Sequence, residues 1–139
     1  MSTVVSQLDA KIYASLRDRL LTLPGGYTLV DQSETYPTEA DTPFILVQDV
    51  RFEPASRYLR GENENRGLFS LAVMTPLEWT HFQTLTIAGL IREHFPKSAK
   101  YTKDDVTVEI LETPSYVGNA YRDMAFNRLP VSVRWRCAG

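Results

Sequence analysis

The sequence predicts an α+β protein in which two main helices pack on a mostly antiparallel sheet that carries an extended hairpin arm. Two segments repeat apolar residues every three or four positions, two others alternate apolar and polar residues, and another is apolar throughout. The resulting order is one helix, two or three strands, a second helix and two final strands. We expect residues 1–139 to form a single domain, because the length is typical of one.

The first predicted element is a helix at the N-terminus. Its apolar residues recur at spacings of three or four, which places the following residues on one side of a helix: Val5, Leu8, Ile12, Leu16, Leu20 and Leu23. The sequence Pro24-Gly25-Gly26 ends it. A short strand over residues 27–30 and a polar loop over residues 31–43 are expected to follow.

A strand pair with a long excursion between its members is predicted next. Residues 44–50 form a near-continuous apolar run, which is typical of a central strand covered on both faces. Residues 67–74 are its expected antiparallel partner. Residues 51–66 are hydrophilic and long for a simple connection, so we expect them to form a hairpin arm that projects from the sheet.

The second helix has the clearest predicted start. Thr75 stands as an N-cap, Pro76 at the first helical position and Glu78 where a capping box is completed. The helix is expected to run to about Phe95, with Pro96 ending it. Its apolar residues lie around most of its circumference, which indicates cover by more than one surface, one of which could be another subunit.

Two strands complete the predicted sheet. Residues 106–110 alternate apolar and polar side chains, and residues 129–137 do so more strictly. Residues 113–127 between them are interpreted as a long connection.

The composition excludes several classes of protein. Fifteen Lys and Arg against seventeen Asp and Glu give a formal net charge of −2, which argues against a dedicated nucleic-acid-binding protein. The apolar runs are far shorter than the ~20 residues of a membrane-spanning helix. Cys137 is the only cysteine, and a free thiol without a secretory signal fits a soluble protein of a reducing cytoplasm, with an intermolecular disulfide as the alternative.

No catalytic, cofactor-binding or metal-binding motif stands out. His81 and His94 are thirteen residues apart on one predicted helix, so they point in different directions and cannot share a metal. We expect a surface or packing role for both. Asp104 and Asp105 fit a turn before a strand. The sequence therefore predicts no enzyme activity and no cofactor.

Charge is distributed unevenly along the chain. Residues 24–50 contain five acidic residues and no Lys or Arg, whereas residues 121–139 contain four arginines against Asp123 alone. One interpretation is an unevenly charged, solvated surface. The other is a heterologous ring, in which an acidic patch of one subunit contacts a basic patch of its neighbour that includes Arg134 and Arg136.

Further candidate interaction residues lie in the arm and near the second helix. Those of the arm are its tyrosine and three of its four arginines, the fourth being Arg51: Arg57, Tyr58, Arg60 and Arg66. Glutamates offset most of this charge and no aromatic ladder is present, so a protein partner is favoured over nucleic acid. Trp79, Phe82 and Leu85 are candidates for burial between subunits, with an ordinary helix–sheet core as the equal alternative.

The order and packing pattern of these elements resemble the tail terminator proteins of long-tailed bacteriophages. The resemblance covers nearly the whole chain. It rests on the N-terminal amphipathic helix and on residues 42–47, 66–73, 87–96 and 129–135. These segments carry packing patterns rather than reactive motifs.

The resemblance implies a structural protein of the virion, located in the tail and assembled in the host cytoplasm. Such proteins form a hexameric ring at the head-proximal end of the tail tube, stop its polymerisation and present a surface to the stopper or head-completion ring. The implied partners are other copies of the chain, the tail tube protein and the stopper protein. DNA can pass through the lumen, and neither a membrane nor sequence-specific nucleic acid is expected as a partner. The alternatives are another neck component, such as a stopper or head–tail connector, and, less favoured, a small enzyme or ligand-binding domain.

Overall fold

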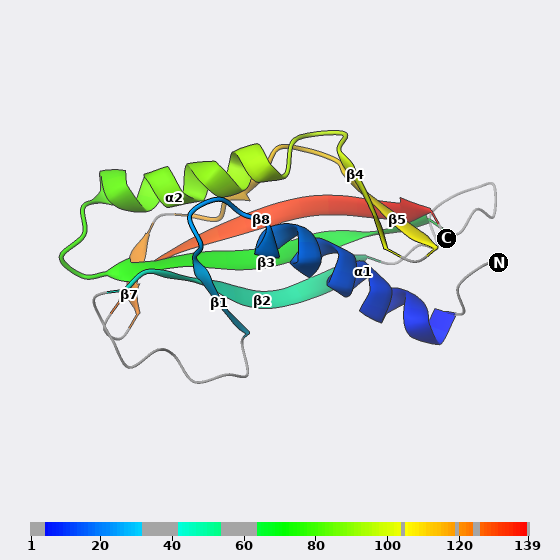
Figure 1. Cartoon of the computed structure of the whole chain (residues 1–139), viewed down its shortest axis with the longest axis horizontal. Coiled ribbons are helices and arrows are strands. Elements are labelled where there is room, and N and C mark those ends of the chain that lie inside the picture. Colours follow the sequence, from blue (N-terminus) through cyan, green and yellow to red (C-terminus); the bar gives the residue numbers. More distant parts are fainter. Residues whose placement is uncertain are drawn as a thin grey trace.

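Two helices lie along one face of a long, curled sheet (Figure 1). The computed structural model describes residues 5–31, 42–53, 64–103, 105–118, 120–123 and 126–138. The helices are α1 (Val5–Leu21) and α2 (His81–His94). The strands are β1 (Thr28–Asp31), β2 (Phe44–Glu53), β3 (Glu64–Pro76), β4 (Lys100–Lys103), β5 (Val106–Ile110), β6 (Ser115–Tyr116), β7 (Tyr121–Asp123) and β8 (Phe126–Ala138).

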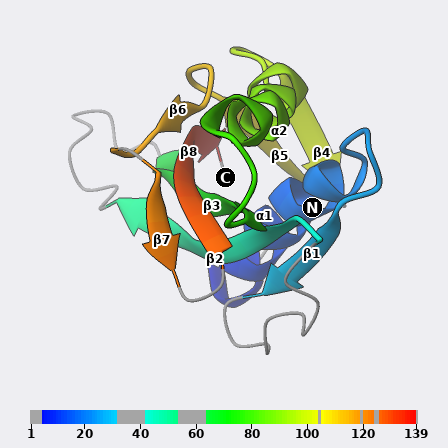
Figure 2. The same ribbon diagram turned by 90° about the vertical axis from the view of Figure 1, so that its left-hand side faces the viewer.

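The sheet is antiparallel except for the pairing of β1 with β2. Its strands follow the order β1-β2-β3-β8-β5-β4. The long strands β3 and β8 pair along their whole length, and the other edge of β8 pairs in turn with β5, β6 and β7. Viewed along the long axis, the strands curl around α1 (Figure 2). The predicted α+β class with a mostly antiparallel sheet is confirmed.

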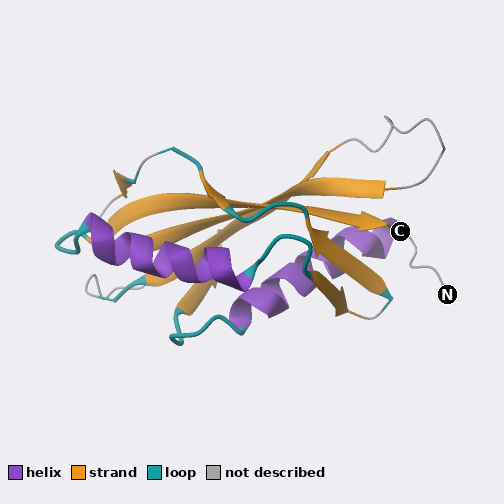
Figure 3. Ribbon diagram, turned by 90° about the horizontal axis from the view of Figure 1, so that it is seen from above, coloured by secondary structure: helices purple, strands orange, loops and turns teal. Residues whose placement is uncertain are grey.

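The main core lies on the helix side of the sheet, which is the face that α1 and α2 cover (Figure 3). Its members in the helices recur at helical spacing: Leu8, Ile12, Leu16, Leu20, Ile87, Ala88 and Ile91. Its members in the two long strands are alternate residues: Phe69, Leu71, Val73, Leu129, Val131, Val133, Trp135 and Cys137. The alternation predicted for residues 129–137 therefore separates a buried face from an outer face, as expected for a half-buried strand.

A smaller apolar cluster lies on the opposite face, at one end of the sheet. It consists of Val30, Phe44, Leu46, Ala72, Met74 and Phe126. The rings of Phe44 and Phe126 meet edge to face with their centroids 5.0 Å apart. All four residues from Phe44 to Val47 are consequently buried, which confirms the prediction of a strand covered on both faces.

Helix α1 contacts both edge strands of the curled sheet, β1 and β4. On one side, Tyr13 and Arg17 donate hydrogen bonds to the carboxylate of Asp31 in β1, at 3.0–3.2 Å. On the other side, Asp18 forms an ion pair with Lys103 in β4. Burial raises the pKa of the Tyr13 hydroxyl, and the Asp31 carboxylate beside it adds to this rise.

The predicted start of the second helix is wrong. Thr75 and Pro76 are the last residues of β3, because their pairing with β8 continues to that point. The helix instead begins at His81 with Thr80 as its N-cap. The Thr80 hydroxyl accepts a hydrogen bond from the Gln83 backbone N–H at 3.2 Å, and the Gln83 side chain accepts one from the Thr80 backbone N–H at 2.8 Å. This is a second capping box, formed five residues later than the predicted one.

Two other predictions need correction. Residues 113–127 are more than a connection, because they contribute β6 and β7 to the edge of β8. The short strand β4 was not predicted. Strands β2 and β3 also remain paired as far as Glu53 and Arg66, so the base of the predicted arm belongs to the sheet. Residues 54–63, with Arg57, Tyr58 and Arg60, lie outside the described residues.

Candidate functional site

Three predicted interaction residues lie together on the sheet face that points away from the helices. In β8, Trp135 is fully buried on the helix side, so Arg134 and Arg136 on either side of it are directed to the opposite face. Arg66 in β3 is the direct register partner of Arg136, and directly paired residues share a face. We call Arg66, Arg134 and Arg136 the arginine face.

The arginine face also contains acidic residues, because Glu53 in β2 is the register partner of Arg66. Arg134 and Arg136 are exposed, whereas Arg66 is half-buried. Glu109 in β5 is the register partner of Arg136, and its carboxylate accepts a hydrogen bond from the Arg136 Nε–H. A guanidinium presents a planar set of donors that fits a carboxylate in two-point contact. The chemistry available at this face is therefore recognition of carboxylates, as the contact with Glu109 illustrates.

The structure places the predicted residues around the second helix in two environments. Trp79 and Leu85 are half-buried and pack against the main core of their own chain. Phe82, in the first turn of α2, is 79% exposed. The buried positions of the helix, such as Thr84 and Ile87, face the sheet, so Phe82 points away from it. Of these three side chains, Phe82 is the one available for contact with another molecule.

Two other exposed apolar side chains were not singled out from the sequence as interaction residues. Leu77 lies in the loop that leads into α2, and Tyr121 lies in β7 at the same end of the molecule (Figure 1). Their exposed fractions are 37% and 50%. Tyr121 was hidden in a segment interpreted as a connection, and the stack of the Arg128 guanidinium on its ring is visible only in three dimensions.

The C-terminal ends of the two helices are joined by an exchange of hydrogen bonds. The Arg19 side chain of α1 donates to the His94 carbonyl at 3.1 Å, and the His94 ring nitrogen Nε2 lies 2.8 Å from the Arg19 carbonyl. The Tyr101 hydroxyl also donates to the His94 carbonyl, at 3.0 Å. These contacts satisfy carbonyl groups that the last turn of a helix leaves without partners. Burial, followed by the nearby Arg19 charge, lowers the pKa of His94 despite the hydrogen bond to the carbonyl.

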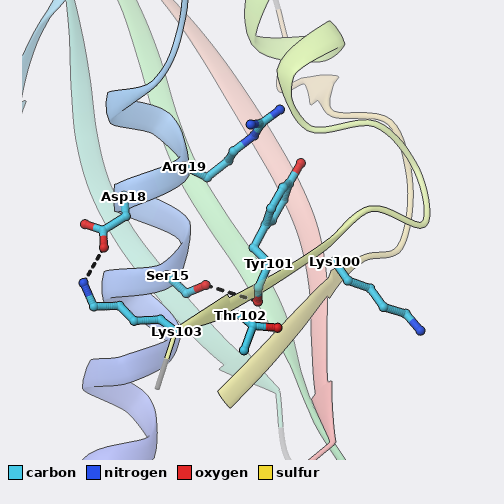
Figure 4. Close-up of a pocket in the computed structure, with 7 residues that line it drawn as sticks. All are labelled: Ser15, Asp18, Arg19, Lys100, Tyr101, Thr102 and Lys103. Carbon is cyan, nitrogen blue, oxygen red and sulfur yellow. Dashed lines mark hydrogen bonds and ion pairs between the residues drawn. The ribbon is translucent and has the colours of Figure 1, made fainter. Parts of the chain in front are cut away.

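A pocket of about 350 Å³ lies between α1 and β4 (Figure 4). It is lined by Ser15, Asp18, Arg19, Lys100, Tyr101, Thr102 and Lys103. Most of the polar atoms around it hold the helix to the strand: Ser15 donates to the Tyr101 carbonyl at 3.4 Å, and the Arg19 guanidinium lies 5.0 Å from the centre of the Tyr101 ring. Lys100 points away from the other side chains (Figure 4). We therefore assign this pocket a structural role.

Among the described residues, we find no arrangement of side chains that is typical of a catalytic site. Among them, no group of three or more His, Cys, Asp or Glu side chains could hold a metal ion, and neither helix is long and apolar enough to cross a membrane. Cys137 is buried, and burial raises the pKa of its thiol. The surface features that stand out are the arginine face and the exposed side chain of Phe82.

Two solved structures resemble this chain over nearly its whole length. One solved structure, whose name assigns no function, superposes with a TM-score of 0.70 at 16% sequence identity, over 99% of this chain and 98% of that one. A chain from the virion of a native gene transfer agent particle gives a TM-score of 0.64 at 17% identity, over 99% of this chain and 100% of that one. At these identities the two structures show a shared fold. No curated protein sequence matches the chain.

A family model gives the more specific result. The model that describes the phage tail terminator protein matches residues 11–135, which include most of α1, all of α2, strands β1 to β7 and most of β8. This chain therefore belongs to the phage tail terminator protein family.

Proposed function

We propose that this protein forms a hexameric ring at the head-proximal end of a phage tail tube, stops polymerisation of the tube and joins the tail to the stopper or head-completion ring. The observation that carries the proposal is the family match over residues 11–135. The family describes structural proteins of the phage tail, so a non-enzymatic role in the virion is its direct consequence. Ring formation, the position on the tube and the two partners are the proposed steps.

The placement of the candidate surfaces on the described residues supports a role as a ring subunit. A heterologous ring needs two different surfaces on each subunit, so that one fits the other around the axis. The arginine face and the exposed Phe82 lie on different elements and point in different directions. The sheet edges β1 and β4 are short, and α1 fastens both of them. We therefore assign subunit contacts to side chains of the faces rather than to strand addition at these two edges.

The similar chain from a gene transfer agent virion supports the proposed location. That chain comes from an assembled particle and shares the fold over the full length of this protein. We assign the axial contacts with the tube and the stopper to the arm, which includes Arg57, Tyr58 and Arg60, and to residues 113–127. Phe82 is assigned to a contact between subunits, because Trp79 and Leu85 are already packed within their own chain.

Deletion of the gene from its phage tests the proposed function. Negative-stain electron microscopy of the lysate should show overlong tails without heads, and expression of the chain in trans should restore normal tail length. Tails of normal length that fail to join heads would instead identify a stopper or connector. Intact infectious particles would contradict both assignments. Native mass spectrometry of the purified protein at increasing concentration tests the hexamer.

A further inference from the structure

We propose that the outer face of α2 binds the β6–β7 edge of a second copy of this chain. The outer face is the side of the helix opposite its buried residues, and it consists of Phe82, Thr86, Gly89 and Glu93. The β6–β7 edge presents Val117, Tyr121 and Arg122. The inference rests on the proposed ring and names the surface of the neighbour that Phe82 contacts. It gives these three edge residues to the neighbouring subunit and leaves the rest of residues 113–127 for axial contacts.

The outer face of α2 points directly away from the sheet. The helix buries these four residues: Thr84, Ile87, Ala88 and Ile91. Successive residues of a helix turn by about 100°, which directs the outer face about 180° from the mean direction of the buried side. Phe82 is the apolar anchor of this face, since its side chain is 79% exposed. The half-buried side chains of Leu85 and Leu90 flank the face, so apolar surface continues around the helix.

Gly89 is the second unusual feature of the outer face. It lies in the interior of α2, where glycine is less favourable than any residue except proline, because it loses the most backbone freedom. A Cβ atom added to Gly89 would meet no heavy atom within 4 Å beyond its own stretch of helix. Within the described chain, therefore, no contact requires a glycine at this position. A glycine of this kind allows the backbone of a partner to approach the helix closely.

The β6–β7 edge presents exposed apolar side chains on the other side of the sheet. The Val117 backbone N–H donates to the Pro130 carbonyl at 3.0 Å, and Tyr121 is the register partner of Arg128. Leu129 between these two β8 residues points into the main core, so Val117 and Tyr121 share the opposite face. Their exposed fractions are 57% and 50%. One subunit therefore carries the outer face of α2 and the β6–β7 edge on different sides, where each can contact a different neighbour.

The two surfaces complement each other in charge and in chemistry. Glu93 on α2 and Arg122 on β7 are exposed charges of opposite sign, and neither forms an ion pair within the described chain. Phe82 and Tyr121 are aromatic side chains of the kind that anchor protein–protein contacts. The Glu93 carboxylate repels phosphates, which disfavours DNA as the partner. Since both surfaces belong to one sequence, a ring of identical subunits can form the same contact at every junction.

Gly89→Ala tests the close approach of the partner. The added methyl group favours the helix, so the Tm of the chain should rise by about 3–5 °C at concentrations at which it is monomeric. The same group holds the partner backbone away, so self-association should weaken about tenfold or more near physiological salt. Circular dichroism on heating measures the first effect, and sedimentation velocity over a concentration series measures the second. A stabilised variant that associates as tightly as the wild type overturns the close approach at Gly89.

A mixing experiment tests the pairing of the two surfaces. Phe82→Asp and Tyr121→Asp should each weaken self-association of the full chain about tenfold or more. An equimolar mixture of the two variants should form dimers but no larger rings, because one chain retains Phe82 and the other retains Tyr121. Leu21→Asp is the control, since it makes the same change at a 57% exposed apolar residue outside both surfaces, and it should leave association unchanged. Circular dichroism verifies that each variant is folded.

The failures of the inference and of the proposed function give different results. A mixture of folded variants that stays monomeric overturns the pairing of Phe82 with Tyr121, as does a wild-type chain that stays monomeric at high concentration. If Phe82→Asp weakens association and Tyr121→Asp does not, the outer face of α2 has another occupant and the proposal is wrong. Each of these outcomes leaves the terminator role intact. Normal tails in the gene deletion would contradict the terminator role itself, whatever the association of the purified chain.

Discussion

The two faces of the sheet differ in what their side chains contact. Side chains on one face pack within the chain, whereas several on the other face are exposed. On the helix side, Trp135 and Phe69 are fully buried, and the polar groups at the ends of both helices bond to each other. On the opposite face, the next residues along the same strand, Arg134 and Arg136, are exposed. One strand thus stabilises the fold through one set of side chains and offers the alternate set to solvent or to a partner.

The opposite face is itself divided along the length of the sheet. Near the start of β8 it is covered by the small apolar cluster that includes Phe44 and Met74, whereas near the end of β8 it carries arginines. An antiparallel sheet commonly buries one face and leaves the other solvated. Here the exposed arginines Arg134 and Arg136 lie near the end of β8, away from the apolar cluster. Adjacent residues on β3 and β8 can therefore serve different purposes. One set stabilises the fold, and the alternate set is available for contacts in assembly.

The largest expected effect comes from removing a side chain on the helix side of β3. Phe69→Ala should lower the free energy of unfolding by about 3–5 kcal/mol, because Phe69 is fully buried and its ring meets those of Tyr13 and Phe95 edge to face. The adjacent Leu68→Ala on the other face should lower it by less than about 1 kcal/mol, since Leu68 is half-exposed. Urea unfolding of both variants measures the difference. Equal losses would contradict the proposed division between the two faces.

A smaller effect is expected where the helices that cover the sheet are joined. Arg19→Ala should lower the free energy of unfolding by about 1–3 kcal/mol, because it removes the bond to the His94 carbonyl and the contact with the Tyr101 ring. Lys11→Ala is the matched control in the same helix. Lys11 forms an ion pair with Asp105 whose loss should change stability by less than about 1 kcal/mol. A larger loss for Lys11→Ala than for Arg19→Ala would show that the junction of the helix ends contributes little.

The sequence predicted the elements whose signal is contained within one segment. The spacing of Leu8, Ile12 and Leu16 defines α1, and the alternation through Val131, Val133 and Trp135 defines β8. Each pattern repeats often enough within its own segment to predict both the element and its buried face. The order of these elements also carried the resemblance to the tail terminator family, which the family match confirms.

The errors arose where pairing between distant segments decides the structure. Thr75 and Thr80 each begin a possible capping box, and local preference does not choose between them. The choice follows from the pairing of Thr75 with Asn127 in β8, which extends β3 past the first box. Strands β6 and β7 contain so few residues that no periodicity can develop within them.

The same reasoning applies to the candidate site. Arg66 was assigned to the arm, and Arg134 and Arg136 to a separate basic patch near the C-terminus. The register of β3 against β8 places all three on one face. No pattern within either segment contains this information, because the register depends on the alignment of two strands that are distant in sequence.

The capping box that the structure selects gives the next prediction. Thr80→Ala should lower the free energy of unfolding by about 1 kcal/mol, because it leaves the Gln83 backbone N–H without its acceptor at the start of the helix that covers β3 and β8. Thr86→Ala is the control in the same helix. Its exposed hydroxyl donates to the Phe82 carbonyl, so its removal should change stability by less than about 0.5 kcal/mol. Similar losses in both variants would contradict Thr80 as the N-cap.

The smallest effect is a dependence of stability on pH that originates on the helix side. Burial lowers the pKa of His94 in the folded chain below that of an ordinary histidine, which is about 6.5 in the unfolded chain. As the pH falls from about 7.5 to 5.5, the unfolded chain therefore binds a proton at this position more readily than the folded chain does, and stability decreases. His94→Gln should remove this part of the pH dependence, whereas His81→Gln, at an exposed residue of the same helix, should retain it. Urea midpoints at several pH values measure the two slopes. A slope that survives His94→Gln would mean that His94 titrates alike in both states, and the half-buried exchange of hydrogen bonds between the helix ends would then have no influence on its protonation.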